Sequence, residues 1–281
     1  DPPVCDPGGP YGPLECVAGQ AQVVVDGSAA FDPDDDPISF EYFSSCGSIF
    51  DDNTLESPTA TIPFDGDDCP LECEVQQNVS DGLNTSMCFT AITVQDTIDP
   101  VWAPAPANGM FECDPAQNQA QIDAWVNSNA GAAATDTCDL TPSVGRFNVM
   151  TTPECGFTST TTMQVRATDG CNEISADVMF EVVDTTAPTI TCPVEPILAQ
   201  CVNPLGIPAG MVPIDVTASD TCGDVTITDD RPDVYPPSCG DLYPPTTVTF
   251  TATDDCGNTA SCEVIVEVKG ALCCPGYVDS E

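Results

Sequence analysis

The chain has 281 residues, of which 45 are acidic and four are basic, and its formal net charge is -41 at pH 7. Such a surface repels the phosphates of nucleic acids and of anionic lipids, so the composition excludes nucleic acid as a partner and insertion into a membrane. Histidine is absent, which excludes Ser-His-Asp and Cys-His catalysis and His-ligated zinc, and we therefore expect no enzyme.

The 18 cysteines include no Cys-x-x-Cys pair of the metal-binding type, and they indicate disulfides, which persist in an oxidising compartment. We therefore expect an extracellular protein, secreted or at the cell surface. A compact fold with this charge needs screening salt or bound cations. Carboxylate clusters offer the oxygen ligands that calcium prefers, so we expect calcium as a cofactor. The alternative is the solvated acidic surface of a halophilic or marine protein.

Strand patterns dominate the chain. Apolar residues alternate with polar ones along residues 38–42, 247–252 and 263–268, and turns rich in Pro, Gly and Asp separate such segments. This pattern indicates antiparallel sandwiches in which one face of each sheet is buried. We predict an all-β fold of three tandem immunoglobulin-like β-sandwiches stapled by disulfides, over residues 1–95, 96–183 and 184–270, with a tail at 271–281.

The first domain contains an acidic loop, in which Asp32, Asp34 and Asp36 begin like an EF-hand. Pro37 at the required Gly position and Phe43 at the bidentate Glu position exclude that motif. The loop is either a calcium site or an acidic turn between strands. Further along, the sequence matches the N-glycosylation pattern on an expected exposed hairpin, at Asn78 and Asn84.

Short linkers with a rigid proline separate the domains, at residues 96–100 and 184–188. Domains joined in this way should form a semi-extended rod. After the first linker, Asp114-Pro115 resembles an N-cap followed by a helical first residue, and Ile122, Trp125 and Val126 share one helical face. We predict one short helix over residues 115–127, in the middle domain, and expect that the third domain lacks it.

A cysteine frame occurs twice, with its two copies displaced by the 88 residues between Asp96 and Asp184. Short flanking motifs recur as well. Asp-Thr directly precedes Cys138 and Cys222, and Ala-Thr-Asp lies shortly before Cys171 and Cys256. A repeat of this length is a whole small domain. The frame consists of Cys113, Cys138, Cys155 and Cys171 in the second domain and of Cys201, Cys222, Cys239 and Cys256 in the third.

We derive a pairing from the end of a sandwich that each cysteine occupies. If the strands run alternately down and up, bridges must join cysteines at the same end, because the Cα atoms must lie within about 7 Å. For the third domain this suggests Cys192–Cys262, Cys201–Cys239 and Cys222–Cys256. For the second domain it suggests Cys113–Cys155 and Cys138–Cys171, and for the first Cys5–Cys88.

The remaining cysteines are less determined. In the first domain Cys16, Cys46, Cys69 and Cys73 are expected to pair among themselves, in an order that the spacing does not fix. The tail adds the adjacent pair Cys273 and Cys274. These two either form a vicinal disulfide or a link back into the last domain, or they bridge to a neighbouring subunit.

The residues 248–268, with 184–193 before them, resemble the hyalin-repeat (HYR) domain, an immunoglobulin-like extracellular module. The second domain is similar but lacks the outer bridge. Residues 25–42 of the first domain resemble the polycystic-kidney-disease (PKD) domain, with Tyr42 where that family usually has Trp. The resemblance implies tandem surface modules of bacterial adhesins, extracellular filaments or multidomain secreted enzymes, which are not themselves usually catalytic.

Three groups of carboxylates are candidate calcium ligands. The first is the acidic loop of Asp32, Asp34 and Asp36. The second is the upper end of each repeat, where Asp136 would meet Asp169 and Asp220 would meet Asp254. The third is the linkers, where an ion could be held by Asp96, Asp99 and Asp184.

We predict a non-catalytic structural or adhesive protein, a rod-like unit of a bacterial surface adhesin or filament that calcium stabilises. Its expected partners are further copies of itself or neighbouring domains of a longer surface protein. The alternative is a glycan-binding accessory module of a secreted multidomain protein. That alternative needs exposed aromatic side chains to contact surface glycans, and the best candidates are Tyr235 and Tyr243.

Overall fold

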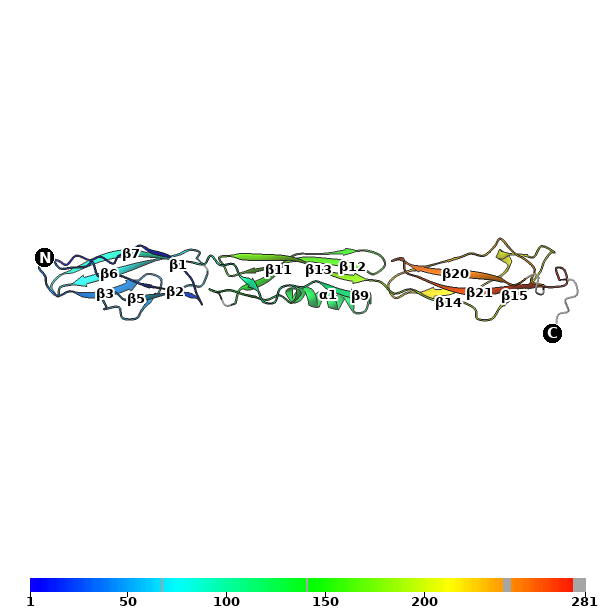
Figure 1. Cartoon of the computed structure of the whole chain (residues 1–281), viewed down its shortest axis with the longest axis horizontal. Helices are drawn as coiled ribbons and strands as arrows, with labels where there is room; N and C mark the ends of the chain where they lie inside the picture. Colours follow the sequence, from blue (N-terminus) through cyan, green and yellow to red (C-terminus); the bar gives the residue numbers. More distant parts are fainter. Residues whose placement is uncertain (67, 140, 240–243, 275–281) are drawn as a thin grey trace. The chain divides into compact units, whose positions relative to one another are not determined.

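The computed structural model describes residues 1–66, 68–139, 141–239 and 244–274. Over these residues the chain is mostly strand and forms three β-sandwich units, which are coloured blue to cyan, green, and yellow to red in Figure 1. The predicted all-β fold with one helix is confirmed, while the exact domain boundaries stay a prediction. No helix among the described residues is long and apolar enough to cross a membrane.

The first sandwich packs a four-stranded sheet against a three-stranded one. The larger sheet has the order β1 (Tyr11–Glu15), β7 (Thr85–Gln95), β6 (Leu71–Ser80) and β3 (Ser39–Ser44). The smaller has the order β2 (Gln20–Val24), β5 (Thr59–Pro63) and β4 (Ile49–Phe50). Tyr42, Ile62 and Val75 are buried between the sheets, because alternate residues of each strand point inward.

The middle sandwich is built on the sheet of β11 (Ser143–Pro153), β12 (Ser159–Thr168), β13 (Glu173–Val183) and β9 (Gly109–Glu112). A second, two-stranded sheet pairs β10 (Ala134–Thr135) with β8 (Val101–Trp102). The helix α1 spans Asn118–Asn127, three residues later than predicted at its start. The expected cap is present, since the Asp114 carboxylate accepts a hydrogen bond from the backbone N–H of Ala116 at 3.0 Å.

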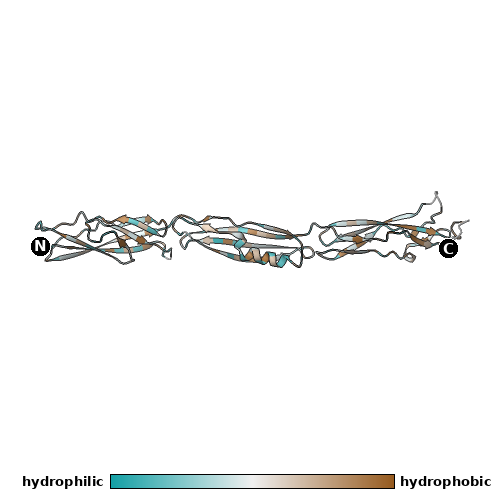
Figure 2. Cartoon of the chain, turned by 90° about the horizontal axis from the view of Figure 1, so that it is seen from below, coloured by the Kyte–Doolittle hydropathy of each residue, from teal (hydrophilic) through white to brown (hydrophobic). Residues whose placement is uncertain are grey.

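The third sandwich is built on the sheet of β15 (Ile197–Gln200), β21 (Thr259–Lys269), β20 (Thr246–Asp254) and β18 (Val225–Asp229). Two short pairs accompany it, β14 (Thr189–Thr191) with β17 (Thr217–Ser219) and β16 (Ile207–Pro208) with β19 (Val234–Tyr235). Among its described residues it has a 3₁₀ turn at Ala209–Met211 and no α-helix, as expected. Figure 2 colours the ribbon by hydropathy, and apolar segments, in brown, lie on strands of all three sandwiches.

All three sandwiches end in the same way. The last long strand, β7, β13 or β21, pairs in parallel with a short strand, β1, β9 or β15. We call this the lower end of a sandwich. The upper end is the opposite one, where the turn between the last two long strands lies, for example at residues 169–172 of the middle sandwich.

The compact units of the chain are not the sandwiches themselves. One unit comprises Asp1–Asn108, Trp125–Val149 and Thr162–Met179, and the other comprises Gly109–Ala124, Met150–Thr161 and Phe180–Glu281. The division passes through the middle sandwich. Each unit therefore contains one junction between neighbouring sandwiches, and each junction is described within its own unit below.

Candidate functional site at the joints between sandwiches

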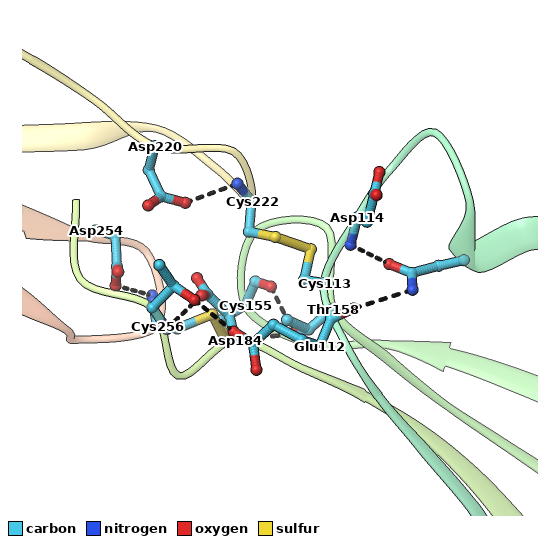
Figure 3. The surroundings of a disulfide bond; sticks show 12 residues. Glu112, Cys113, Asp114, Cys155, Thr158, Asp184, Asp220, Cys222, Asp254 and Cys256 are labelled. Carbon is cyan, nitrogen blue, oxygen red and sulfur yellow. Dashed lines mark hydrogen bonds between the residues drawn. A yellow bond between two sulfur atoms is a disulfide. The ribbon is translucent and has the colours of Figure 1, made fainter. Parts of the chain in front are cut away.

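Two disulfides cross each junction between neighbouring sandwiches. We call the junction with Cys16–Cys138 and Cys69–Cys171 the first joint. The second joint has Cys113–Cys222 and Cys155–Cys256, both shown in Figure 3. In each joint the lower end of the preceding sandwich supplies one cysteine of every bridge, and the upper end of the following sandwich supplies the other.

This wiring corrects the pairing predicted from the sequence. The bridges Cys5–Cys88 and Cys192–Cys262 are present as predicted. The predicted pairs that are wrong are Cys113–Cys155, Cys138–Cys171, Cys201–Cys239 and Cys222–Cys256. The reason is that the short linker brings the lower end of one sandwich against the upper end of the next, so that a close partner exists outside the domain.

The remaining cysteines also differ from expectation. Only Cys46 and Cys73 of the four undetermined cysteines in the first domain pair with each other, because Cys16 and Cys69 belong to the first joint. Cys273 and Cys274 are bonded within the chain, to Cys201 and Cys239, which removes them as candidates for a bridge between subunits. The tail thus forms disulfides with the two lower-end cysteines of the third sandwich, whereas at each joint the lower-end cysteines form disulfides with the following sandwich.

Each joint also gathers four carboxylates. One comes from the residue before a lower-end cysteine, one from the linker, and two from the turns of the following upper end. The set of the first joint is Glu15, Asp96, Asp136 and Asp169, and that of the second is Glu112, Asp184, Asp220 and Asp254. Figure 3 shows the second set around the two bridges.

Identical local contacts hold the preceding half of each set. The Glu15 carboxylate accepts hydrogen bonds from the backbone N–H and the hydroxyl of Thr97, at 2.7 and 3.1 Å. The Glu112 carboxylate accepts the same two bonds from Thr185, at 2.7 and 2.9 Å. Each linker therefore binds back onto the glutamate of the sandwich that it leaves, and this fixes the direction in which the chain enters the next sandwich.

The following half is held by backbone N–H groups. Asp136 Oδ1 accepts a hydrogen bond from the Cys138 N–H at 2.6 Å, and Asp220 Oδ1 accepts one from the Cys222 N–H at 2.6 Å. Asp169 Oδ1 accepts bonds from two successive N–H groups, at 2.7 and 2.8 Å. These bonds orient one oxygen of each carboxylate and leave the other for a further partner.

At the first joint that further oxygen has no partner. Asp96, Asp136 and Asp169 are only 6, 8 and 5 % exposed, and the Oδ2 atom of each is buried and accepts no hydrogen bond. Oxygens of Asp96 and Asp169 lie within 4.8 Å of one another, and so do oxygens of Asp184 and Asp220 at the second joint. Buried charges in proteins are normally paired or bound to a metal ion.

Three basic side chains form ion pairs with other carboxylates. Arg166 pairs with Glu173, Arg231 with Asp229, and Lys269 with Glu267, and none of these ion pairs includes a joint carboxylate.

Burial, followed by the like charges of its neighbours, raises the pKa of Asp96. The same two causes, in the same order, raise the pKa of Asp184, against one opposing backbone hydrogen bond. A divalent cation would relieve both effects.

The predicted metal ligands therefore fall into two classes. The linker residues Asp96 and Asp184 meet the upper-end residues, so that two separately predicted groups form one set. Asp99 is exposed on the first linker, and it is not among the carboxylates whose charges raise the pKa of Asp96. Asp32, Asp34 and Asp36 lie at the upper end of the first sandwich, opposite the end that forms the first joint. The metal assignment itself stays a prediction.

Sequence reasoning missed Glu15 and Glu112. A signal was available, because each glutamate directly precedes a cysteine of the joint, in Glu15-Cys16 and Glu112-Cys113. At the lower end of the third sandwich the matching dipeptide is Gln200-Cys201. Gln200 pairs with Lys269, so the next residue, Gly270, occupies the position of the linker aspartates. These two positions thus carry no carboxylate in the third sandwich.

Two other candidate groups are placed differently from expectation. Tyr235 is fully buried, so it offers no face to a glycan, and Tyr243 lies outside the described residues. Asn84 is exposed in the turn between β6 and β7, as expected for a glycosylation acceptor. Asn78 lies in the middle of β6, half-buried, where its side chain accepts a hydrogen bond from Gln76.

Similarity to known proteins is found among solved structures. No family model matches the sequence, and no curated protein sequence matches it. Mouse cadherin-23 EC22–24 has 14 % identity and a TM-score of 0.35, over 95 % of this chain and 98 % of that chain.

Two further structures are similar. The human desmocollin-1 ectodomain has 10 % identity and a TM-score of 0.29, over 95 % of this chain and 61 % of that chain. Drosophila N-cadherin EC1-4 has 12 % identity and a TM-score of 0.28, over 96 % of this chain and 74 % of that chain.

Proposed function

We propose that the chain is a non-catalytic extracellular protein with a structural or adhesive role, a unit of a bacterial surface adhesin or filament that transmits tension. The observation that carries the proposal is the pair of disulfides across each joint. Bridges that join neighbouring sandwiches add little to the core of either one, whereas they do resist separation of the two. The nine bridges of the described chain indicate the oxidising environment outside the cell.

The bridges shorten the covalent path through the chain. One path follows residues 1–16, crosses Cys16–Cys138, follows residues 138–155, crosses Cys155–Cys256 and ends with residues 256–281. It contains about 60 residues, which span about 200 Å when fully extended, against about 950 Å for the whole chain. Unfolding under tension therefore releases little length while the bridges are intact.

Calcium is the second part of the proposal. The carboxylates of each joint come from both sandwiches and from the linker, so one bound ion would connect all three. Calcium takes six to eight oxygen ligands and tolerates irregular geometry, which suits four carboxylates supplemented by water. The buried, unpartnered oxygens of the first joint support this assignment, because they are otherwise charges without compensation.

Single-molecule stretching between the two ends of the chain tests the tension-bearing role. We expect a final contour length of about 200 Å for the oxidised protein and about 950 Å after reduction. A long contour in the oxidised protein would show that the joints are not covalently closed and would remove the basis of the proposal. Imaging of native material should show the chain within fibres or surface structures, and binding to a glycan array would instead favour an accessory module.

A further inference from the structure

The upper end of the first sandwich repeats the carboxylate half of a joint. Asp32 matches Asp136 and Asp220, since each follows the short edge segment that pairs with the start of its sandwich, at Val4–Phe31 in the first. Asp81 matches Asp169, since each opens the turn between the last two long strands. The first sandwich thus carries the two carboxylates that a following sandwich brings to a joint.

The hydrogen bonds confirm this correspondence. Asp32 Oδ1 accepts bonds from the N–H groups of Asp34 and Asp36, at 2.8 and 3.3 Å. Asp136 Oδ1 accepts bonds from the residues two and three further on, at 2.6 and 3.3 Å. Asp81 Oδ1 accepts bonds from the second and third following residues, at 2.6 Å each, as Asp169 does.

Asp32 also shares the feature that marks the first joint. It is 6 % exposed, and its Oδ2 atom is buried and accepts no hydrogen bond. Nothing in the acidic loop requires a charged side chain to be buried there, since an amide could accept the same two backbone bonds. The buried, unpartnered oxygen is therefore an independent indication of a cation at this end.

The cysteine positions are changed in a way that adds to the acidity. Asp34 stands where Cys138 and Cys222 stand, two residues after the matching aspartate. Leu83 stands where Cys171 stands, and its side chain is 92 % exposed. This end therefore has three carboxylates from one sandwich, and the two positions that carry joint cysteines in the later sandwiches carry no cysteine here.

We propose that Asp32, Asp34 and Asp81 form a third calcium site, at the upper end of the first sandwich. The inference rests on the proposed function, because it takes the joints as calcium sites and applies their carboxylate pattern to the upper end of the first sandwich.

A cationic group already meets these carboxylates in the structure. The ammonium of Asp1 forms an ion pair with Asp34, and both Asp32 and Asp81 lie close enough to interact with it electrostatically. All three carboxylates therefore act electrostatically on the same group, the nitrogen of Asp1. Asp34 is half exposed, so its charge is screened by water, and we expect this site to bind calcium more weakly than the joints.

Counting bound calcium by equilibrium dialysis at rising free calcium tests the proposal on the intact, oxidised chain. We expect three ions for the wild type, with the third binding last, and two for D32N. Asn keeps the oxygen that accepts the backbone bonds, so the loop should remain folded. The matched control is D35N, which removes the same charge from the neighbouring exposed Asp35, whose positive φ of 61° suits Asn.

The outcomes separate this site from the joints. D96N and D184N should each lose one joint ion and still bind the ion of the third site. If the joints bound no ion in any variant while the third site did, the calcium part of the proposed function would fail and the third site would stand. Two ions in the wild type, or three in D32N, would overturn the third site. Hydrogen exchange provides a readout without substitution, and calcium should slow it at residues 32–36 and 81–84; unchanged exchange there at saturation would also overturn it.

Discussion

Replacement of Asp96 by Asn should change the stability of the protein in opposite directions with and without calcium. The substitution retains the oxygen that accepts a hydrogen bond from the Ile98 N–H at 3.1 Å, so the linker should keep its conformation. It removes a charge that is 94 % buried among the carboxylates of the first joint.

Without calcium, burial and the like charges raise the pKa of Asp96. A carboxyl whose folded pKa is raised destabilises the folded state once both forms are ionised, because the unfolded state gives up its proton at lower pH. This loss of folding stability develops as pH rises from the ordinary pKa range of Asp to the raised pKa of the folded state, and it persists at higher pH. In a chelator at pH 7, D96N should therefore melt at a higher temperature than the wild type.

With calcium the order should reverse. An ion present at 100 times its dissociation constant stabilises the folded state by about 2.7 kcal/mol, which corresponds to a melting shift of about 5–11 °C for a unit of this size. D96N loses most of that gain at the first joint and retains the gain at the second.

Differential scanning calorimetry in chelator and in millimolar calcium measures both shifts. The matched control is D99N, which removes the same charge from an exposed position of the same linker and should behave like the wild type. If calcium raised the melting temperatures of D96N and the wild type equally, Asp96 would not be a ligand, and our reasoning about the joint would fail.

Three further outcomes follow from the joints. Peptide mapping without reduction should recover Cys16–Cys138, Cys69–Cys171, Cys113–Cys222 and Cys155–Cys256, and a Cys113–Cys155 peptide would refute the joint wiring. G156A should be less stable in calorimetry than G131A by about 1–3 kcal/mol, because a methyl group at Gly156 would collide with the Cys222 carbonyl whereas Gly131, also at positive φ, faces open space; equal stability would contradict the close approach. In chelator, the stability of D184N relative to the wild type should increase from pH 4 to pH 7, because burial raises the pKa of Asp184, and a constant difference would show that this carboxyl is not perturbed.

The sequence predicted the elements that depend on local patterns. Alternation at Val264, Val266 and Val268 marked a strand with one buried face, and these three residues are at most 1 % exposed. Asp114 and the proline after it marked the start of the helix within three residues. The joint carboxylates were also largely visible as candidates, because short words around them recur at the repeat distance.

Pairing between distant residues depended on the tertiary structure. The two bridges predicted correctly, Cys5–Cys88 and Cys192–Cys262, lie within single sandwiches, where the strand order alone brings the cysteines together. The joint bridges were missed because a repeated frame has the same spacing whether its cysteines pair inside a domain or with the next one. Glu15 and Glu112 were missed for the same reason, since nothing local shows that they face the next sandwich.

By itself, then, the sequence determined that the chain is a series of acidic, disulfide-bonded sandwiches, because hydrophobic alternation and the repeat are properties of neighbouring residues. Only the tertiary structure decided that the cysteines and carboxylates of one sandwich meet those of the next. The physical reason is that a linker of a few residues places the lower end of one sandwich against the upper end of the following one. Contact across that joint, rather than spacing along the chain, selects the partners.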